Sequence, residues 1–100
     1  MRRVRLSVAA DRGMRKIAAH MLQYWGEPQR DAYIGELFEA FARLAETPQI
    51  AARADAIREG YRKFPQGSHV IFFRGSEVNG IEVVRVLHKR MDIDPQFSSP

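Results

Sequence analysis

The sequence contains no cysteine, which excludes disulfide bonds and thiolate-bound metal sites and is compatible with a reducing cytosol. No apolar run approaches the roughly 20 residues that a membrane-spanning helix needs. The first residues, MRRVRLSVAA, have a basic front but lack the long apolar stretch of a secretion signal. With 100 residues, the chain is expected to form one domain with one hydrophobic core.

Motifs for small ligands are also missing. The three histidines do not fall into a cluster with the spacing of a metal site. None of the seven glycines belongs to a glycine-rich loop that fits a nucleotide. We therefore expect no cofactor.

Positive charge is in excess but unevenly distributed. The formal net charge is +4, to which residues 1–20 contribute +5, residues 21–60 contribute −3 and residues 61–100 contribute +2. A basic balance suggests an acidic partner, either nucleic acid or an acidic protein segment. A solvated surface without a partner explains the charge equally well.

The N-terminal half has the pattern of a strand followed by two helices. Residues 3–8 alternate like a strand with one buried face, and Ser7 can cap the helix that follows. Gly26 is a natural stop for that helix, and Pro28 suits the first turn of a second helix, which ends at Thr47-Pro48. The short link makes the helices an antiparallel hairpin. The apolar positions at helical spacing are Met14, Ile17, Met21, Leu22 and Trp25 in the first helix, and Tyr33, Ile34, Leu37, Phe38, Phe41, Leu44 and Ala45 in the second.

The C-terminal half has the pattern of three strands, over residues 60–64, 70–74 and 81–88. Residues 49–58 are expected to form a short helical turn or loop. The prediction is an α+β fold of order β-α-α-β-β-β, in which the helix hairpin packs on one face of a small, mostly antiparallel sheet. Residues 1–92 form this single domain, and residues 93–100 form a loose C-terminal tail.

The last two strands are apolar on both faces. Val70 and Phe72 alternate with Ile71 and Phe73, and residues 81–87 show the same pattern. The helix hairpin can cover only one face, so the other should carry an apolar strip. Large exposed apolar patches mark interaction sites. Alternatively, the loop before the strands or the C-terminal tail folds over the strip.

Three blocks carry a resemblance to a known family: WGEPQRDAYIGELFEAFARLAETP, REGYRKFPQGSHVIFFR and NGIEVVRVLHKRMD. Together, in this order and spacing over residues 20–92, they resemble the ParE-type toxins of the RelE/ParE superfamily. The first helix departs from the family pattern, because Arg12, Arg15 and Lys16 outnumber Asp11 where members usually carry acidic residues.

The resemblance implies the toxin of a bacterial type II toxin–antitoxin system, located in the cytoplasm. Its partner would be a ParD-like antitoxin, a ribbon-helix-helix DNA-binding protein whose C-terminal segment wraps the toxin in a hetero-oligomer. ParE toxins are described as inhibiting DNA gyrase by binding, and operator DNA would be contacted only through the antitoxin. Two other functions stay open: a RelE-like ribosome-dependent mRNA endoribonuclease, and a non-toxic homologue that acts only as antitoxin co-repressor.

An RNA-cleaving site would need a base, an acid and cations for the developing phosphorane charge. The ribonuclease branch typically has a tyrosine or histidine near its C-terminus, whereas this chain has no tyrosine after Tyr61. The residues that could move a proton or hold the phosphorane charge are Arg62, Lys63, His69, Arg85, His88, Lys89 and Arg90. Of these, His88 could still serve as the acid or base, but we predict no catalytic residue and no enzymatic activity.

Two sets of residues are predicted to bind partners. The antitoxin contacts are apolar positions in excess of one core: Met14, Met21, Phe38 and Phe73. The target contacts are the basic cluster near the end of the last strand: Arg85, His88, Lys89 and Arg90. As alternatives, the first set is ordinary core and the second is a solvated strand end.

Overall fold

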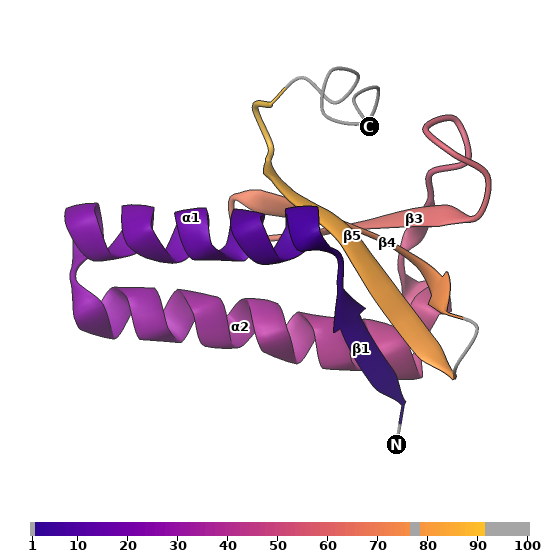
Figure 1. The fold of residues 1–100 in the computed structure, drawn as a ribbon, viewed down its shortest axis with the longest axis horizontal. Coiled ribbons are helices and arrows are strands. Elements are labelled where there is room, and N and C mark those ends of the chain that lie inside the picture. The colour runs from indigo at the N-terminus through magenta and orange to yellow at the C-terminus, as the bar shows by residue number, and fades with distance from the viewer. Residues whose placement is uncertain (1, 77–78, 92–100) are drawn as a thin grey trace.

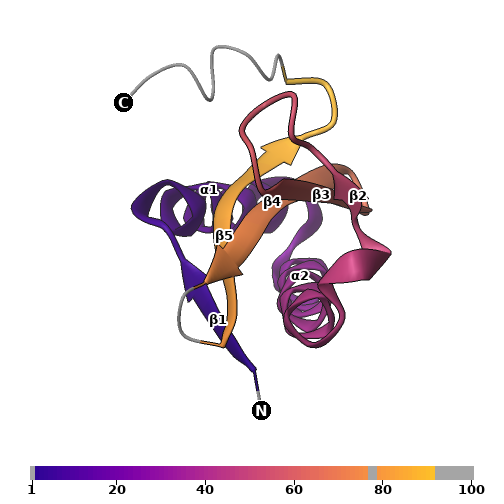
Figure 2. The same ribbon diagram turned by 90° about the vertical axis from the view of Figure 1, so that its right-hand side faces the viewer.

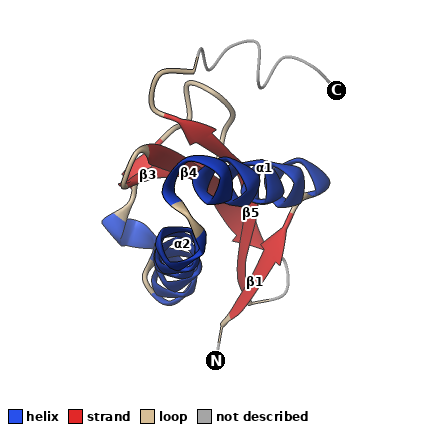
Figure 3. Cartoon of the chain, turned by 90° about the vertical axis from the view of Figure 1, so that its left-hand side faces the viewer, coloured by secondary structure: helices blue, strands red, loops and turns tan. Residues whose placement is uncertain are grey.

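Two helices pack on one face of a sheet in the computed structural model, which describes residues 2–76 and 79–91 (Figure 1). The predicted order of a strand, two helices and then strands is confirmed, and Figure 3 shows both helices in front of the sheet. The elements are β1 (Arg3–Leu6), α1 (Val8–Trp25), α2 (Glu27–Glu46), the 3₁₀ helix η1 (Pro48–Ile50), β2 (Ala52–Arg53), β3 (Tyr61–Gln66), β4 (His69–Ser76) and β5 (Gly80–His88).

The strands lie in the order β1-β5-β4-β3-β2 (Figure 2). β1 pairs parallel to β5, and the other three pairs are antiparallel. The predicted α+β fold with a mostly antiparallel sheet is therefore confirmed. The parallel pair needs a long crossover, and the α1–α2 hairpin belongs to the connection that supplies it.

Residues 49–58 differ from the expected turn or loop, because they include β2 as well as η1. Ala52 and Arg53 pair with Lys63 and Arg62, so β2 is a two-residue edge strand. A strand this short shows no alternation in the sequence. β3 is also longer than predicted and runs through Pro65 to Gln66. Beyond Lys63, β3 has no strand on its β2 side within the described residues, and a strand edge tolerates the missing N–H of proline.

A β-bulge between β4 and β5 sets which side chains face the helices. Phe72 pairs with Arg85 and Phe73 pairs with Val83, so Val84 is an extra residue on β5. Because a bulge shifts the two-residue period, Val83 and Val86 both join the core under the helices. The simple alternation in the sequence had placed Val83 and Val86 on opposite faces, which is wrong.

The core lies between the helix hairpin and the inner face of the sheet. Leu37, Phe41 and Leu44 of α2 are at most 1% exposed, as are the sheet residues Ile71 and Phe73. Burying side chains of this size contributes about 1.5–3 kcal/mol each. The large residues with under 2% exposure are Phe41, Phe72, Phe73, Leu37, Leu44, Ile71, Ile81 and Val83.

The opposite face of the sheet does not carry the expected exposed strip. Phe72 is 1% exposed and Leu87 is 6% exposed, and both lie outside the core cluster under the helices. Val70 and Val84 are half-buried. The predicted loose tail, residues 93–100, lies outside the described residues. The exposed large apolar side chains lie instead mainly on the helices, where Figure 1 shows the hairpin extending beyond the sheet.

Two small residues fix the start of α1 against β5. The Ser7 hydroxyl accepts a hydrogen bond from the Ala10 N–H at 2.9 Å, which confirms its predicted capping role. The same hydroxyl donates to the Val84 carbonyl oxygen at 2.6 Å. In the second turn of α1, a Cβ on Gly13 would lie only 3.3 Å from the Val86 carbonyl oxygen. The glycine that weakens the helix in isolation therefore allows close packing on the sheet.

Gly80→Ala should lower the free energy of unfolding by at least about 2 kcal/mol, because a Cβ would collide with the backbone of Arg3 in the β1–β5 pair. Gly35→Ala in α2 is the matched control. Nothing lies within 4 Å of its new Cβ, so it should stabilise the protein by about 0.5–1 kcal/mol. Urea denaturation measures both variants. A Gly80→Ala protein as stable as the wild type would contradict the parallel β1–β5 pairing.

Candidate partner-binding groove

A groove runs between α1 and the C-terminal part of β5 and consists of two adjoining cavities. The first, which we call the basic cavity, has a volume of about 270 Å³. The second, which we call the aromatic cavity, has a volume of about 260 Å³. His69 and His88 line both, so the cavities form one continuous groove. α1 contributes to both, from Ala9 to Trp25.

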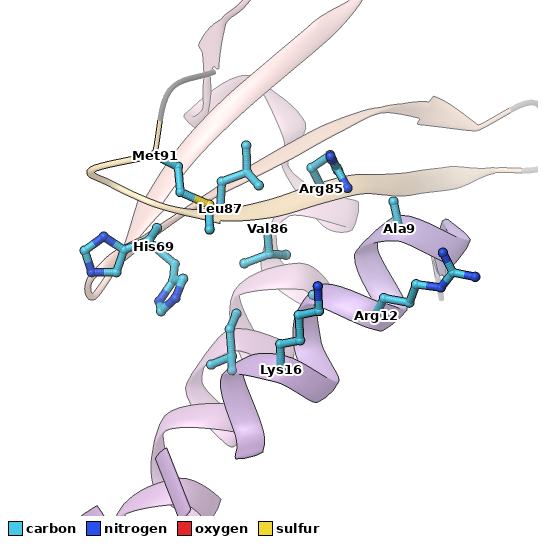
Figure 4. Close-up of a pocket in the computed structure, with 11 residues that line it drawn as sticks. Ala9, Arg12, Lys16, His69, Arg85, Val86, Leu87 and Met91 are labelled. Carbon is cyan, nitrogen blue, oxygen red and sulfur yellow. The ribbon is translucent and has the colours of Figure 1, made fainter. Parts of the chain in front are cut away.

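The basic cavity opens where β5 continues past β1. β1 pairs only as far as Val83, so no strand among the described residues pairs with β5 beyond this point on that side. α1 covers part of this edge, and its Arg12 and Lys16 line the cavity together with Arg85 of β5 (Figure 4). The described residues that line this cavity include no aspartate or glutamate. The cavity can therefore hold an anionic group.

The aromatic cavity lies between the two helices and the turn that joins β3 to β4. Met21 and Trp25 of α1 line one side, and Tyr33 of α2 lines the other. Trp25 is 64% exposed. An exposed indole beside a thioether and a phenol forms a site for an apolar side chain.

Tyr33 connects α2 to the turn between β3 and β4. Its hydroxyl accepts a hydrogen bond from the Ser68 N–H at 3.0 Å and lies 2.6 Å from His69 Nδ1. The hydroxyl can donate its hydrogen to Nδ1 of a neutral imidazole, which is much nearer than the Gln66 carbonyl oxygen at 3.4 Å. The turn approaches the ring closely: a Cβ on Gly67, which has a φ of +60°, would lie 2.7 Å from Tyr33 Cε1. Tyr33 thus fixes the position of His69 in the groove.

His69 is neutral at physiological pH. Burial lowers the pKa of its imidazole from 6.5 to about 4, and the nearby imidazoles of His88 and His20 act in the same direction. The His69 and His88 rings meet edge to face, with their centroids 5.4 Å apart. The groove thus has an uncharged imidazole at its centre.

The predicted antitoxin contacts are only partly accessible. Met14 is 5% exposed and Phe73 is 1% exposed, and both belong to the core under the helices. In the free protein these two side chains offer little exposed surface to a partner. Met21 lines the aromatic cavity. Phe38 is 48% exposed on α2 and packs edge to face on Phe41, outside both cavities.

The predicted target contacts lie at one end of the sheet, as expected from their sequence positions. Arg85 and His88 line the groove. Lys89 and Arg90 follow in an exposed turn, where the Lys89 N–H donates to the Ser68 carbonyl oxygen and the Arg90 N–H donates to His88 Nδ1. These two hydrogen bonds hold the backbone of the turn against the groove, and the two cationic side chains are exposed to solvent.

Sequence reasoning missed the contribution of α1 to the basic cavity. Arg12 and Lys16 are four residues apart, which places them on one face of the helix. That spacing was visible in the sequence, but their proximity to Arg85 depends on how α1 crosses β5. Tyr33 and Trp25 belong to the apolar stripes of the two helices, and the helical pattern gave no sign that they line the aromatic cavity.

The groove is suited to binding. Among the described residues, no group of three histidine, cysteine, aspartate or glutamate side chains is placed to hold a metal ion. No helix in the described part of the chain is long and apolar enough to cross a membrane.

The groove offers cations at one end and an apolar aromatic surface at the other. It fits a ligand that is both acidic and apolar.

Comparisons with known proteins find relatives of this chain. A family model described as the ParE toxin of the type II toxin–antitoxin system parDE matches residues 4–93. The chain is 44% identical over 89 residues to Toxin ParE1 of Mycobacterium tuberculosis, and the aligned region covers 89% of this chain and 91% of that protein. It is 35% identical over 92 residues to Toxin ParE1 of Caulobacter vibrioides, which covers 92% of this chain and 94% of that protein.

A solved structure shares the fold. It is described as the chromosomal ParDE toxin–antitoxin system from P. aeruginosa, and it superposes with a TM-score of 0.72 over 88% of this chain and 96% of that chain. The sequence identity is 16%, so this likeness supports the arrangement of helices and strands alone.

Stability should fall between pH 6.5 and about 4 in a way that depends on His69. In this window the unfolded chain binds a proton at His69 that the folded chain does not bind, because burial lowers the folded pKa to about 4. Acid therefore favours unfolding, by about 1–2 kcal/mol once solvent screening of a partly buried ring is allowed for. His69→Gln has no titrating group there and should lose less stability. Urea denaturation at pH 7 and pH 4.5 compares the two proteins, and identical pH profiles would contradict the buried neutral imidazole.

Proposed function

Because this chain belongs to the ParE toxin family of type II toxin–antitoxin systems, we propose that a ParD-like antitoxin neutralises it and that the free toxin inhibits DNA gyrase by binding. The observation that carries the proposal is the groove along α1. It joins an apolar aromatic cavity to a basic cavity through His69 and His88. A flexible antitoxin segment with acidic and apolar residues has the chemistry to fill it.

The antitoxin segment is proposed to bury its apolar side chains in the aromatic cavity. Met21 and Trp25 line this cavity, and Leu22 and Tyr24 stand exposed beside them at 45% and 63%. This end of the hairpin extends beyond the sheet (Figure 1), so the sheet does not cover it. Exposed apolar side chains that adjoin a cavity are typical of a partner surface. Carboxylates of the same segment would lie near the basic cavity.

The proposed toxic activity involves no chemistry on the target. The two histidines that line both cavities already have local hydrogen-bonding roles, His69 with the Tyr33 hydroxyl and His88 with the Arg90 N–H. Among the residues that the structure describes, no carboxylate lines either cavity to act as a second acid or base. The basic residues are more useful as docking groups, because exposed cations speed and orient association with an acidic surface. The proposed location is the cytoplasm, where gyrase acts on DNA.

Trp25→Ala should weaken antitoxin binding by roughly 10- to 100-fold, since buried tryptophans commonly contribute about 2 kcal/mol or more at interfaces. The fold should remain intact, because the side chain is largely exposed in the free toxin. Ile50→Ala is the control, an exposed apolar residue of η1 outside both cavities. Calorimetric titration with the small protein encoded beside the toxin gene measures both. Equal affinities for the two variants would refute the aromatic cavity as the antitoxin site.

The proposed mechanism is tested with purified toxin. It should slow gyrase or trap it on supercoiled DNA, and it should leave messenger RNA on translating ribosomes intact. His88→Ala should behave like the wild type in the RNA assay, because neither protein is expected to cleave messenger RNA. Codon-specific RNA cuts that disappear in His88→Ala would instead identify a ribosome-dependent ribonuclease.

A further inference from the structure

We propose that the basic cavity binds backbone phosphates of DNA, with Arg12, Lys16 and Arg85 as the phosphate-binding residues. The three cations come from two elements, α1 and β5, and line one cavity of about 270 Å³, to which no acidic side chain of residues 2–76 and 79–91 contributes. Figure 4 shows Lys16 reaching from α1 toward β5, with Arg12 one turn earlier on the helix and Arg85 on the neighbouring strand. Phosphate oxygens accept hydrogen bonds from guanidinium and ammonium groups, and these charge-assisted bonds are strong.

The two helix cations lack a counter-charge within the described residues. Arg12 and Lys16 form no ion pair there, whereas the adjacent Arg15 pairs with Asp11 at 3.0 Å on another side of α1. Like charges at positions i and i+4 of a helix repel one another. A bound anion between them would relieve this repulsion. The arrangement costs the free protein stability and is explained if a ligand supplies the missing negative charge.

The pattern fits a polyanion better than an isolated carboxylate. Arg12 and Lys16 are about 6 Å apart along the helix axis, and Lys89 and Arg90 continue the positive surface beyond His88. A nucleic acid strand carries a regular row of negative charges that such a series can follow. The apolar side chains of the antitoxin segment are proposed to bind in the other half of the groove, and its carboxylates would compete with phosphates for the basic half.

The choice of DNA as the source of the phosphates rests on the proposed gyrase target, because gyrase holds DNA while it acts. The toxin would then contact the DNA as well as the enzyme. Because His69 and His88 line both cavities, an antitoxin segment in the aromatic cavity would lie directly beside the phosphate site. Binding of DNA and binding of antitoxin would therefore compete.

The test uses the full-length toxin and a short fluorescent DNA duplex, without gyrase, so its outcome is independent of gyrase inhibition. Fluorescence anisotropy gives the binding constant between about 50 and 200 mM salt. Arg12→Gln with Lys16→Gln should weaken binding and reduce the slope of log K against log salt by about two, one for each lost phosphate contact. Arg12→Lys with Lys16→Arg keeps both charges and should keep the slope.

The matched control is Arg58→Gln with Lys63→Gln, which removes the same charge from exposed positions outside both cavities. Its slope should stay at the wild-type value. If the control and the Arg12–Lys16 variant lose the same affinity, the effect is net charge alone and the site is refuted. A polyglutamate peptide that binds through Arg12 and Lys16 more tightly than the duplex would also overturn the proposal, and would assign the cavity to an acidic protein segment.

Discussion

The close approach of α1 to β5 is the contact on which the groove depends. Ser7 caps the helix and also bonds the Val84 carbonyl oxygen, so the helix starts at a fixed point on the strand. Gly13 then allows the helix backbone to lie against Val86. With both ends of this first stretch fixed, the later turns of α1 must pass the end of β5. The cations of α1 are thereby brought to Arg85, and Met21 is brought to His69 and His88.

The groove combines two kinds of surface without separating them. His69, held neutral by burial and positioned by Tyr33, lies where the basic and aromatic cavities meet. A protonated His69 would be repelled by the cations of the basic cavity, whereas the neutral ring can contact either an apolar or a polar ligand. In the function proposed above, this junction couples neutralisation to target binding, because a segment that fills one cavity stands in the way at the other.

The candidate site could be predicted from the sequence only in part. The cluster from Arg85 to Arg90 was identified because its members are close in the chain. Met14 and Phe73 were assigned to a partner because the sequence has more apolar positions than one covered sheet face requires. The structure places both in the core, since Phe73 shares with Ile71 the sheet face under the helices and Met14 belongs to the same core cluster. The exposed apolar residues Leu22 and Trp25 follow the same helical pattern as core residues, so periodicity could not distinguish them.

The sequence by itself determined the local structure: the cap at Ser7, the helix ends at Gly26 and Thr47, the order of elements and the resemblance to ParE toxins. These features depend on short-range effects, such as capping, proline geometry and hydrophobic period, which a single stretch of chain contains. Only the tertiary structure decided the short β2, the bulge in β5 and the meeting of Arg12 and Lys16 with Arg85. The first two depend on pairing with a neighbouring strand, and the third brings together segments far apart in the chain. Their relative position is set by the packing of the whole core, and no local pattern encodes it.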